Sequence, residues 1–213
     1  MALLLHRAGL ISGLMPSLVY RTHATDATDQ TTYSFASVDI GAADATRYVI
    51  VALAARNSTA DRTVSSATIA GVSASIVADG SAANTQCAIL MAAVPTGTTG
   101  TIAITFSAAQ LRCGIAVWAA YNLRSATAIA TLATASATLN VNAVTNGFVV
   151  GITSGISQTP VWSGLTEVLV DTSIETTFEM GAASASLVAE ATPRAISISG
   201  AGTTPFSAIA SFR

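Results

Sequence analysis

The sequence contains no lysine and little charge of either sign. All nine of its basic residues are arginine, and charged residues make up 9% of its 213 positions, against about 25% in an ordinary soluble domain. Without lysine the chain cannot build a Walker A phosphate loop, a Schiff-base nucleophile or a lysine general base. The arginines are scattered and the net charge is −2. Nucleic-acid binding needs clustered basic side chains, so we expect no nucleic-acid partner.

Histidine and cysteine are nearly as scarce. His6 and His23 both lie close to the N-terminus. A Ser-His or Cys-His catalytic pair, or a histidine-based zinc site, would therefore require that segment to fold over the rest of the chain. Cys87 and Cys113 each lie in an apolar run. We expect them to be buried thiols, and a disulfide between neighbouring strands is the alternative.

Carboxylates are the remaining side chains that could act as catalytic acids and bases or bind a metal ion. They form an early and a late group: Asp26, Asp29, Asp39 and Asp44, then Glu167, Asp171, Glu175 and Glu179. A calcium site built from Asp26, Asp29 or Asp39 is one alternative, but these residues lack the spacing of an EF-hand. Glu167 and Asp171 lie four apart on a strand-like run and could share a face, as a glycosidase pair requires, whereas solvated charges on the outside of a strand are the simpler interpretation. We assign no catalytic, cofactor-binding or metal-binding residue.

Small and β-branched residues dominate what is present. The chain has 43 alanines, 29 threonines and 23 serines. Short alternating or apolar runs recur about every ten residues between turn residues, and Tyr48–Leu53 is continuous enough for a central strand. This pattern predicts an all-β protein built as an antiparallel sandwich of jelly-roll or immunoglobulin-like type. A helix over Arg124–Ala137 is the local alternative, and its threonines argue against it.

The sequence also contains weak internal repeats. Gly71–Val77 matches Gly164–Val170 at an offset of 93 residues, and residues 101–107 and 114–118 match 194–200 and 207–211 at the same offset. Tyr48–Val51 matches Phe148–Gly151 at an offset of 100. These matches predict two related halves, 31–124 and 125–213, unless they are coincidences of a small residue alphabet. No linker separates the halves, which favours one compact sandwich over two small domains.

The first thirty residues differ from this body. They hold an apolar stretch that His6 and Arg7 interrupt, and no window of the sequence has the roughly 18 apolar residues of a membrane-spanning helix. We expect residues 1–30 to form an extended arm that is buried against a partner subunit. We expect no membrane partner.

The two tryptophans have different settings. Trp118 lies in an apolar run, so we expect it in the core. Trp162 lies beside turn residues in Gln158–Gly164, where an exposed ring would suit stacking on a sugar. Trp162 is therefore the single candidate ligand contact, for a glycan-binding adhesion module. A plug at the end of the sandwich is the structural alternative.

Three stretches carry a family resemblance: Thr31–Val51, Val94–Ser107 and Leu111–Trp118. Through them residues 31–213 resemble β-rich structural proteins of tailed-bacteriophage virions, and no catalytic motif accompanies the resemblance. It implies a virion location, as a capsid decoration or cement protein, a head fibre or a tail protein. It further implies a homo-oligomer, with a trimer as one form, and contacts to other virion proteins through residues 1–30.

Overall fold

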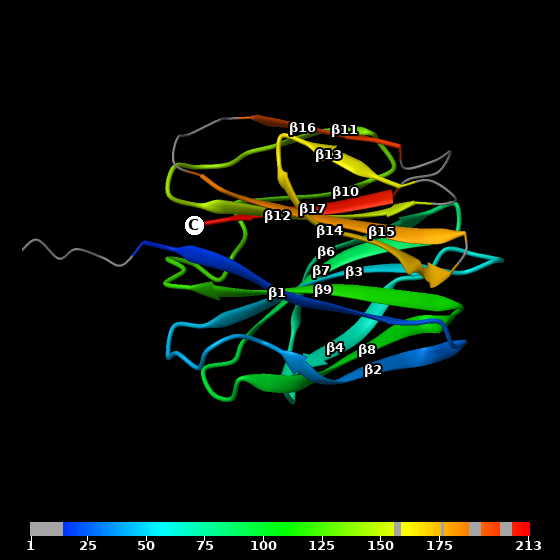
Figure 1. Cartoon of the computed structure of the whole chain (residues 1–213), viewed down its shortest axis with the longest axis horizontal. Helices are drawn as coiled ribbons and strands as arrows, with labels where there is room; N and C mark the ends of the chain where they lie inside the picture. The colour runs from blue at the N-terminus through cyan, green and yellow to red at the C-terminus, as the bar shows by residue number, and fades with distance from the viewer. Residues whose placement is uncertain (1–14, 156–158, 176, 188–192, 201–205) are drawn as a thin grey trace, which may run out of the picture.

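A computed structural model of the chain describes residues 15–155, 159–175, 177–187, 193–200 and 206–213. The described residues form seventeen β-strands and no helix, which confirms the predicted all-β, antiparallel sandwich architecture. Ala130–Thr134 is a strand, so the helical alternative for the surrounding segment is wrong. The strands build four sheets that stack as four layers (Figure 1).

The first two layers contain strands from the first part of the chain. Outer sheet 1 has the order β2 (Gln30–Asp39), β8 (Thr99–Gln110), β4 (Val64–Ile69) and β5 (Val72–Ser73). Inner sheet 1 has the order β1 (Ser17–Asp26), β9 (Arg112–Tyr121), β3 (Tyr48–Arg56), β7 (Thr85–Ala93) and β6 (Ser75–Ala82). Part of the expected arm, residues 17–26, is thus a strand of the body, antiparallel to β9.

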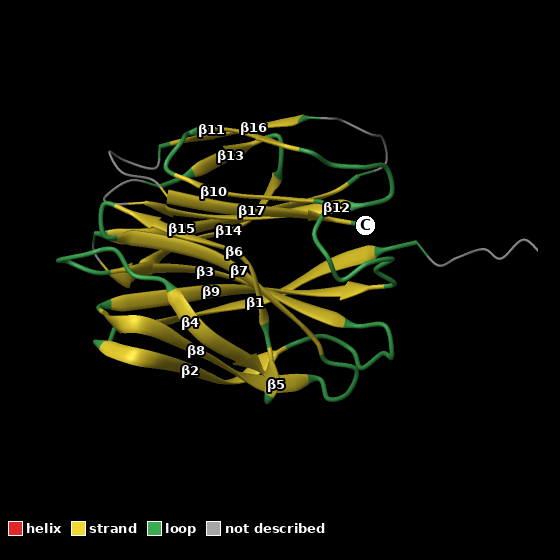
Figure 2. Cartoon of the chain, turned by 180° about the vertical axis from the view of Figure 1, so that it is seen from behind, coloured by secondary structure: helices red, strands yellow, loops and turns green. Residues whose placement is uncertain are grey.

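The other two layers contain strands from the second part. Inner sheet 2 has the order β10 (Ala130–Thr134), β17 (Phe206–Phe212), β12 (Phe148–Gly155), β15 (Phe178–Ser186) and β14 (Thr166–Glu175). Outer sheet 2 has the order β11 (Thr138–Val141), β16 (Arg194–Ser199) and β13 (Val161–Ser163). Figure 2 shows the same stack from behind, with the inner sheets between the outer ones.

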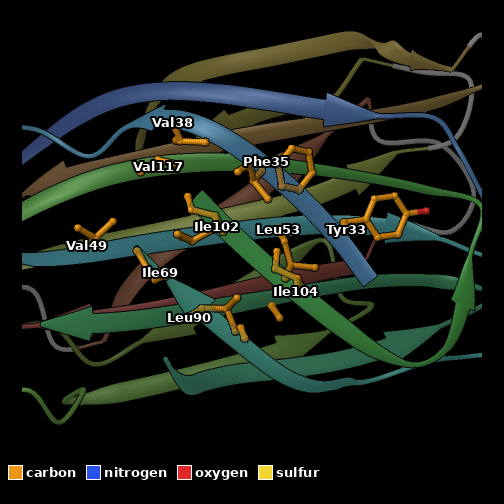
Figure 3. Packing of buried hydrophobic residues seen from close by; sticks show 14 of the residues in the cluster. Tyr33, Phe35, Val38, Val49, Leu53, Ile69, Leu90, Ile102, Ile104 and Val117 are labelled. Carbon is orange, nitrogen blue, oxygen red and sulfur yellow. The ribbon is translucent and has the colours of Figure 1, made fainter. Parts of the chain in front are cut away.

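Three apolar cores separate the four layers. The first core lies between outer and inner sheet 1, where Tyr33, Phe35 and Ile102 meet Leu53 and Leu90 (Figure 3). The central core lies between the two inner sheets, and the second core between inner and outer sheet 2. Each half therefore has its own two-layer core, and the central core between the two inner sheets joins the halves.

Strand β3 shows why the inner strands have continuous apolar sequences. Side chains alternate between the faces of a strand. Val49 and Val51 accordingly face the first core, while Ile50 and Ala52 face the central core. Both faces of an inner sheet are buried, so no polar alternation survives in its sequence.

The two halves share one topology. Eight strands of the first half occupy the same sheet positions, in chain order, as the eight strands of the second half. They are β1, β2, β3, β4, β6, β7, β8 and β9, which correspond in that order to β10 to β17. Details repeat as well: Gly71 and Gly164 have φ values of +81° and +85° in equivalent turns, and β6 and β14 each carry a bulge, between Ile76 and Ala78 and between Glu167 and Leu169.

The register corrects part of the sequence alignment between the halves. Ile50 pairs with Trp118, and Val150, which lies 100 residues after Ile50, pairs with Ala210. Trp118 therefore corresponds to Ala210 rather than to Ser211, an offset of 92 instead of 93. Residues 101–107 and 194–200 are also out of phase at 93, because Ile102 is buried while the matched Ala195 is exposed.

The inner sheets are stacked about a pseudo-two-fold axis. β3 packs against its equivalent β12 at the centre, β6 packs against β10 at one edge, and β1 packs against β14 at the other. Exchanging the halves converts the β6–β10 contact into the β1–β14 contact and leaves the β3–β12 contact unchanged. The central core thus has the arrangement of an isologous dimer interface within a single chain.

Candidate functional site

The early aspartates are engaged in local bonds. Asp26 accepts hydrogen bonds from the backbone and hydroxyl of Thr28 (2.9 and 2.6 Å) and from Gln30 (2.6 Å). Partial burial raises the pKa of Asp26, but these hydrogen bonds outweigh it and hold that pKa below the ordinary value. Asp29 pairs with Arg112 at 3.2 Å.

Asp39 and Asp44 are likewise occupied by neighbouring groups. Arg21 donates to Asp39 at 2.7 Å, and this bond lowers the pKa of the Asp39 carboxyl. Asp44 accepts from the backbone and hydroxyl of Thr46. Within the part of the chain that the structure describes, no group of three or more acidic, histidine or cysteine residues is arranged to hold a metal ion.

The late carboxylates do not follow the expected spacing. Glu167 is exposed and lies opposite Ala183, while Asp171 lies opposite Met180. The bulge after Glu167 adds a residue between them, which breaks the two-residue alternation that would place both on one face. The strand register therefore gives no support to a glycosidase pair at these positions.

The two cysteine side chains are buried, whereas His23 is exposed. Cys87 and Cys113 are fully buried and free, and they face the central core and the first core respectively. β3 lies between their strands, so the alternative of a disulfide between neighbouring strands is wrong. Burial raises the pKa of Cys87 to about 12 and raises that of Cys113 further. His23 is exposed on β1, with Tyr20 Oη 3.4 Å from its Nδ1; His6 lies outside the described residues.

Trp162 is a core residue in this fold. Only 6% of its surface is exposed, and its ring lies in the second core. A Cβ at Gly151 or Gly181 would come within 2.8 or 3.2 Å of that ring, so these two glycines create the space it fills. The ring is consequently not at the surface as a platform for a sugar. Trp118 is buried in the central core, as expected.

The surfaces that remain are the outward faces of the two outer sheets. On outer sheet 1, Thr32, Thr105 and Ser66 form one row across the strands, and Ser34, Ala103 and Thr68 form the next. The Oγ1 atoms of Thr32 and Thr105 are 3.0 Å apart. On outer sheet 2, the row Thr138, Ser197 and Ser163 has the same character. Short hydroxyl and methyl groups cover both faces, and none of these rows contains a charge.

Several charged side chains lie instead at strand ends and in loops, among them Asp39, Asp44 and Arg47. Arg47, 1% exposed, is the largest departure from the sequence expectations. Its guanidinium donates to the carbonyl oxygens of Val94, Gly41, Thr96 and Gly97 at 2.5–2.8 Å. This buried cation holds two loops together. The sequence gives no signal for it, because the carbonyl acceptors belong to residues of any type.

A buried polar chain is the other feature that the sequence did not indicate. Asp79 accepts from Gln86 Nε2 (2.7 Å), and Gln86 Oε1 accepts from Gln110 Nε2 (2.8 Å). Partial burial raises the pKa of Asp79 despite this bond and one from the Val64 backbone. The chain links β6, β7 and β8 across the first core, so it joins the two layers of the first half.

Comparisons with known proteins provide no family for this chain. No protein-family model matches it, and no curated protein matches it either. In the described residues, no helix has the length and apolar character needed to cross a membrane.

Proposed function

We propose that this chain is a structural component of a bacteriophage virion and acts by assembling with other proteins rather than by catalysis. The observation that carries the assembly role is the pair of uncharged outer faces. Rows of short side chains lose little conformational entropy on burial and bring no charge that must be desolvated. Such faces suit close packing against a neighbouring protein.

The virion assignment is supported by the resemblance of Thr31–Val51, Val94–Ser107 and Leu111–Trp118 to phage structural proteins. In this proposal the chain is a capsid decoration or cement protein, a head fibre or a tail protein. It forms a homo-oligomer, of which a trimer is one form, and residues 1–30 carry the contact to other virion proteins. No observation favours the glycan-binding alternative, since the ring of Trp162 is buried.

The proposal is tested on particles from the host that encodes the chain. We expect mass spectrometry of gradient-purified particles to detect the chain at a fixed ratio to the major capsid protein, and immunogold labelling to place it on head or tail. A chain that is abundant in the lysate but missing from purified particles would overturn the virion role.

The role of residues 1–30 needs a truncation that leaves the body intact. β1 begins at Ser17, so removing residues 1–28 would also remove an edge strand. Deleting residues 2–14 alone is the cleaner test. Incorporation of this shorter chain at the full-length level would refute anchoring by the residues before β1.

A further inference from the structure

The edges of the two inner sheets are not equally protected. An edge strand exposes unpaired backbone groups, and proteins commonly block such edges with bulges or charged residues. β1 carries a bulge at Arg21, which is bonded to Asp39. β6 carries a bulge and Asp79, and β14 carries bulges and three acidic residues.

β10 has neither form of protection. Its five residues, Ala130–Thr134, pair with β17 in unbroken register and include no charge. Among the described strands, β17 is its one hydrogen-bonded neighbour. Ile129, directly before β10, is 40% exposed, and Leu132 is only partly buried. The edge strands of the outer sheets are either bulged, as β2 is, or only two to four residues long.

The sequence also contains an apolar segment in need of burial. Residues 1–14 read Met-Ala-Leu-Leu-Leu-His-Arg-Ala-Gly-Leu-Ile-Ser-Gly-Leu, with six leucine or isoleucine side chains. Burying a leucine or isoleucine side chain is worth about 1.5–3 kcal/mol. The segment leads directly into β1, at the opposite edge of the stack from β10.

We propose that residues 2–14 of one copy add as a strand to the free edge of β10 in a second copy. This inference rests on the proposed homo-oligomer and assigns the contact between its copies to residues 2–14. A segment reaching β10 of its own copy would cross four strand spacings of ~4.8 Å and one sheet spacing of ~10 Å. The two directions are perpendicular, so the straight-line distance is about 22 Å, which at ~3.3 Å per residue uses at least about seven residues, including Leu10 and Ile11. A neighbouring copy can receive the whole segment.

This mode of addition determines the kind of assembly. The donor and the acceptor are different surfaces of each copy, so the contact is heterologous and propagates from copy to copy until a ring closes. Backbone pairing supplies affinity, and the apolar side chains cover Ile129 and Leu132.

The test separates donor from acceptor. Chain 1 lacks residues 2–14 but keeps β10, and chain 2 keeps residues 2–14 but carries Thr131→Pro, which removes a backbone donor and stiffens the edge strand. Thr131→Val is the matched control. Light scattering after size exclusion should show an oligomer for the full-length chain and the control, a single-chain mass near 21.4 kDa for chain 2, and a 1:1 complex when chains 1 and 2 are mixed.

Three results would overturn the inference: a monomeric full-length chain, an oligomer of unchanged size for chain 1 or chain 2, or no complex in the mixture. If Thr131→Pro fails to fold by near-UV circular dichroism, Thr131→Arg replaces it, because it copies the protective charge of Arg21 on β1. Failure of the proposed function is distinguishable. Loss of chain 1 from particles with an unchanged oligomer would refute this pairing and leave the virion role standing.

Discussion

Replacing Trp162 by alanine tests whether this ring is structural. The side chain is 94% buried, since 6% remains exposed. A buried tryptophan covers about 200 Å², which at about 25 cal/mol per Å² corresponds to roughly 5 kcal/mol of transfer free energy. Alanine retains part of this area, and the empty space above Gly151 and Gly181 adds a cavity cost. We expect a loss of about 3–5 kcal/mol in the free energy of unfolding.

The assay is urea unfolding followed by the fluorescence of Trp118, which remains in the variant. At about 2–4 °C per kcal/mol for a chain of this size, the melting temperature should also fall by roughly 6–20 °C. Val161→Ala is the matched control, because Val161 is the adjacent residue on β13 and is 53% exposed. A loss below about 1 kcal/mol for Trp162→Ala, or one equal to that of the control, would refute the assignment of Trp162 to the core.

Three further outcomes follow from the buried and paired groups. Arg47→Ala should lower the free energy of unfolding, measured in urea, by about 3 kcal/mol or more, because four carbonyl groups lose a charged donor. Arg47→Lys should recover only part of that free energy. An Arg47→Ala effect below about 1 kcal/mol would contradict this reasoning. Cys87 and Cys113 should not react with a thiol reagent in the native chain and should both react in denaturant, since burial raises both pKa values; rapid native labelling would refute their burial. The pKa of Asp39 is lowered in the fold by its bond to Arg21, so the pairing stabilises the chain fully above the unfolded value of about 3.9 and is lost as the pH falls through the folded pKa. An Asp39→Asn deficit of up to about 1 kcal/mol at pH 6 should therefore shrink progressively as the pH is lowered below about 3.9, and a deficit that does not change with pH would argue against an ionic origin.

The strands most completely predicted from sequence are those buried on both faces. The run Tyr48–Leu53 indicated a central strand, and β3 spans Tyr48–Arg56 at the middle of inner sheet 1. An unbroken apolar run has this meaning only because a second layer covers each face. Periodicity alone does not say which layer lies where, so the sequence predicted a sandwich but not a stack of four sheets.

Trp162 shows why the candidate site was less predictable. Its local sequence, beside Pro160 and Gly164, is that of a turn, and nothing nearby indicates burial. The ring is buried because Gly151 and Gly181, on two other strands, lack the side chains that would block it. That contact depends on tertiary packing between distant residues. The sequence likewise contains no sign of the bulge after Glu167 in β14, which is why Glu167 and Asp171 were expected to share a face.

The pseudo-two-fold axis through the central core relates residues that are not identical in size. Gly114 is equivalent to Phe206, and Cys87 is equivalent to Met180, from their pairing with β3 and β12. In the folded chain Met180 occupies the space above Gly114, where a Cβ would lie 2.7 Å from its sulfur, and the small Cys87 contacts Phe206, with its Sγ 3.0 Å from the carbonyl oxygen.

Each contact therefore joins a large residue to a small one, as a knob fits a hole. Two first halves facing each other would set Cys87 against Gly114 and leave a void, and two second halves would set Met180 against Phe206 and collide. The central core thus recognises the unlike half and rejects the like one. During synthesis, when many copies of both halves are close together, this mismatch would favour folding within one chain over exchange of halves between chains.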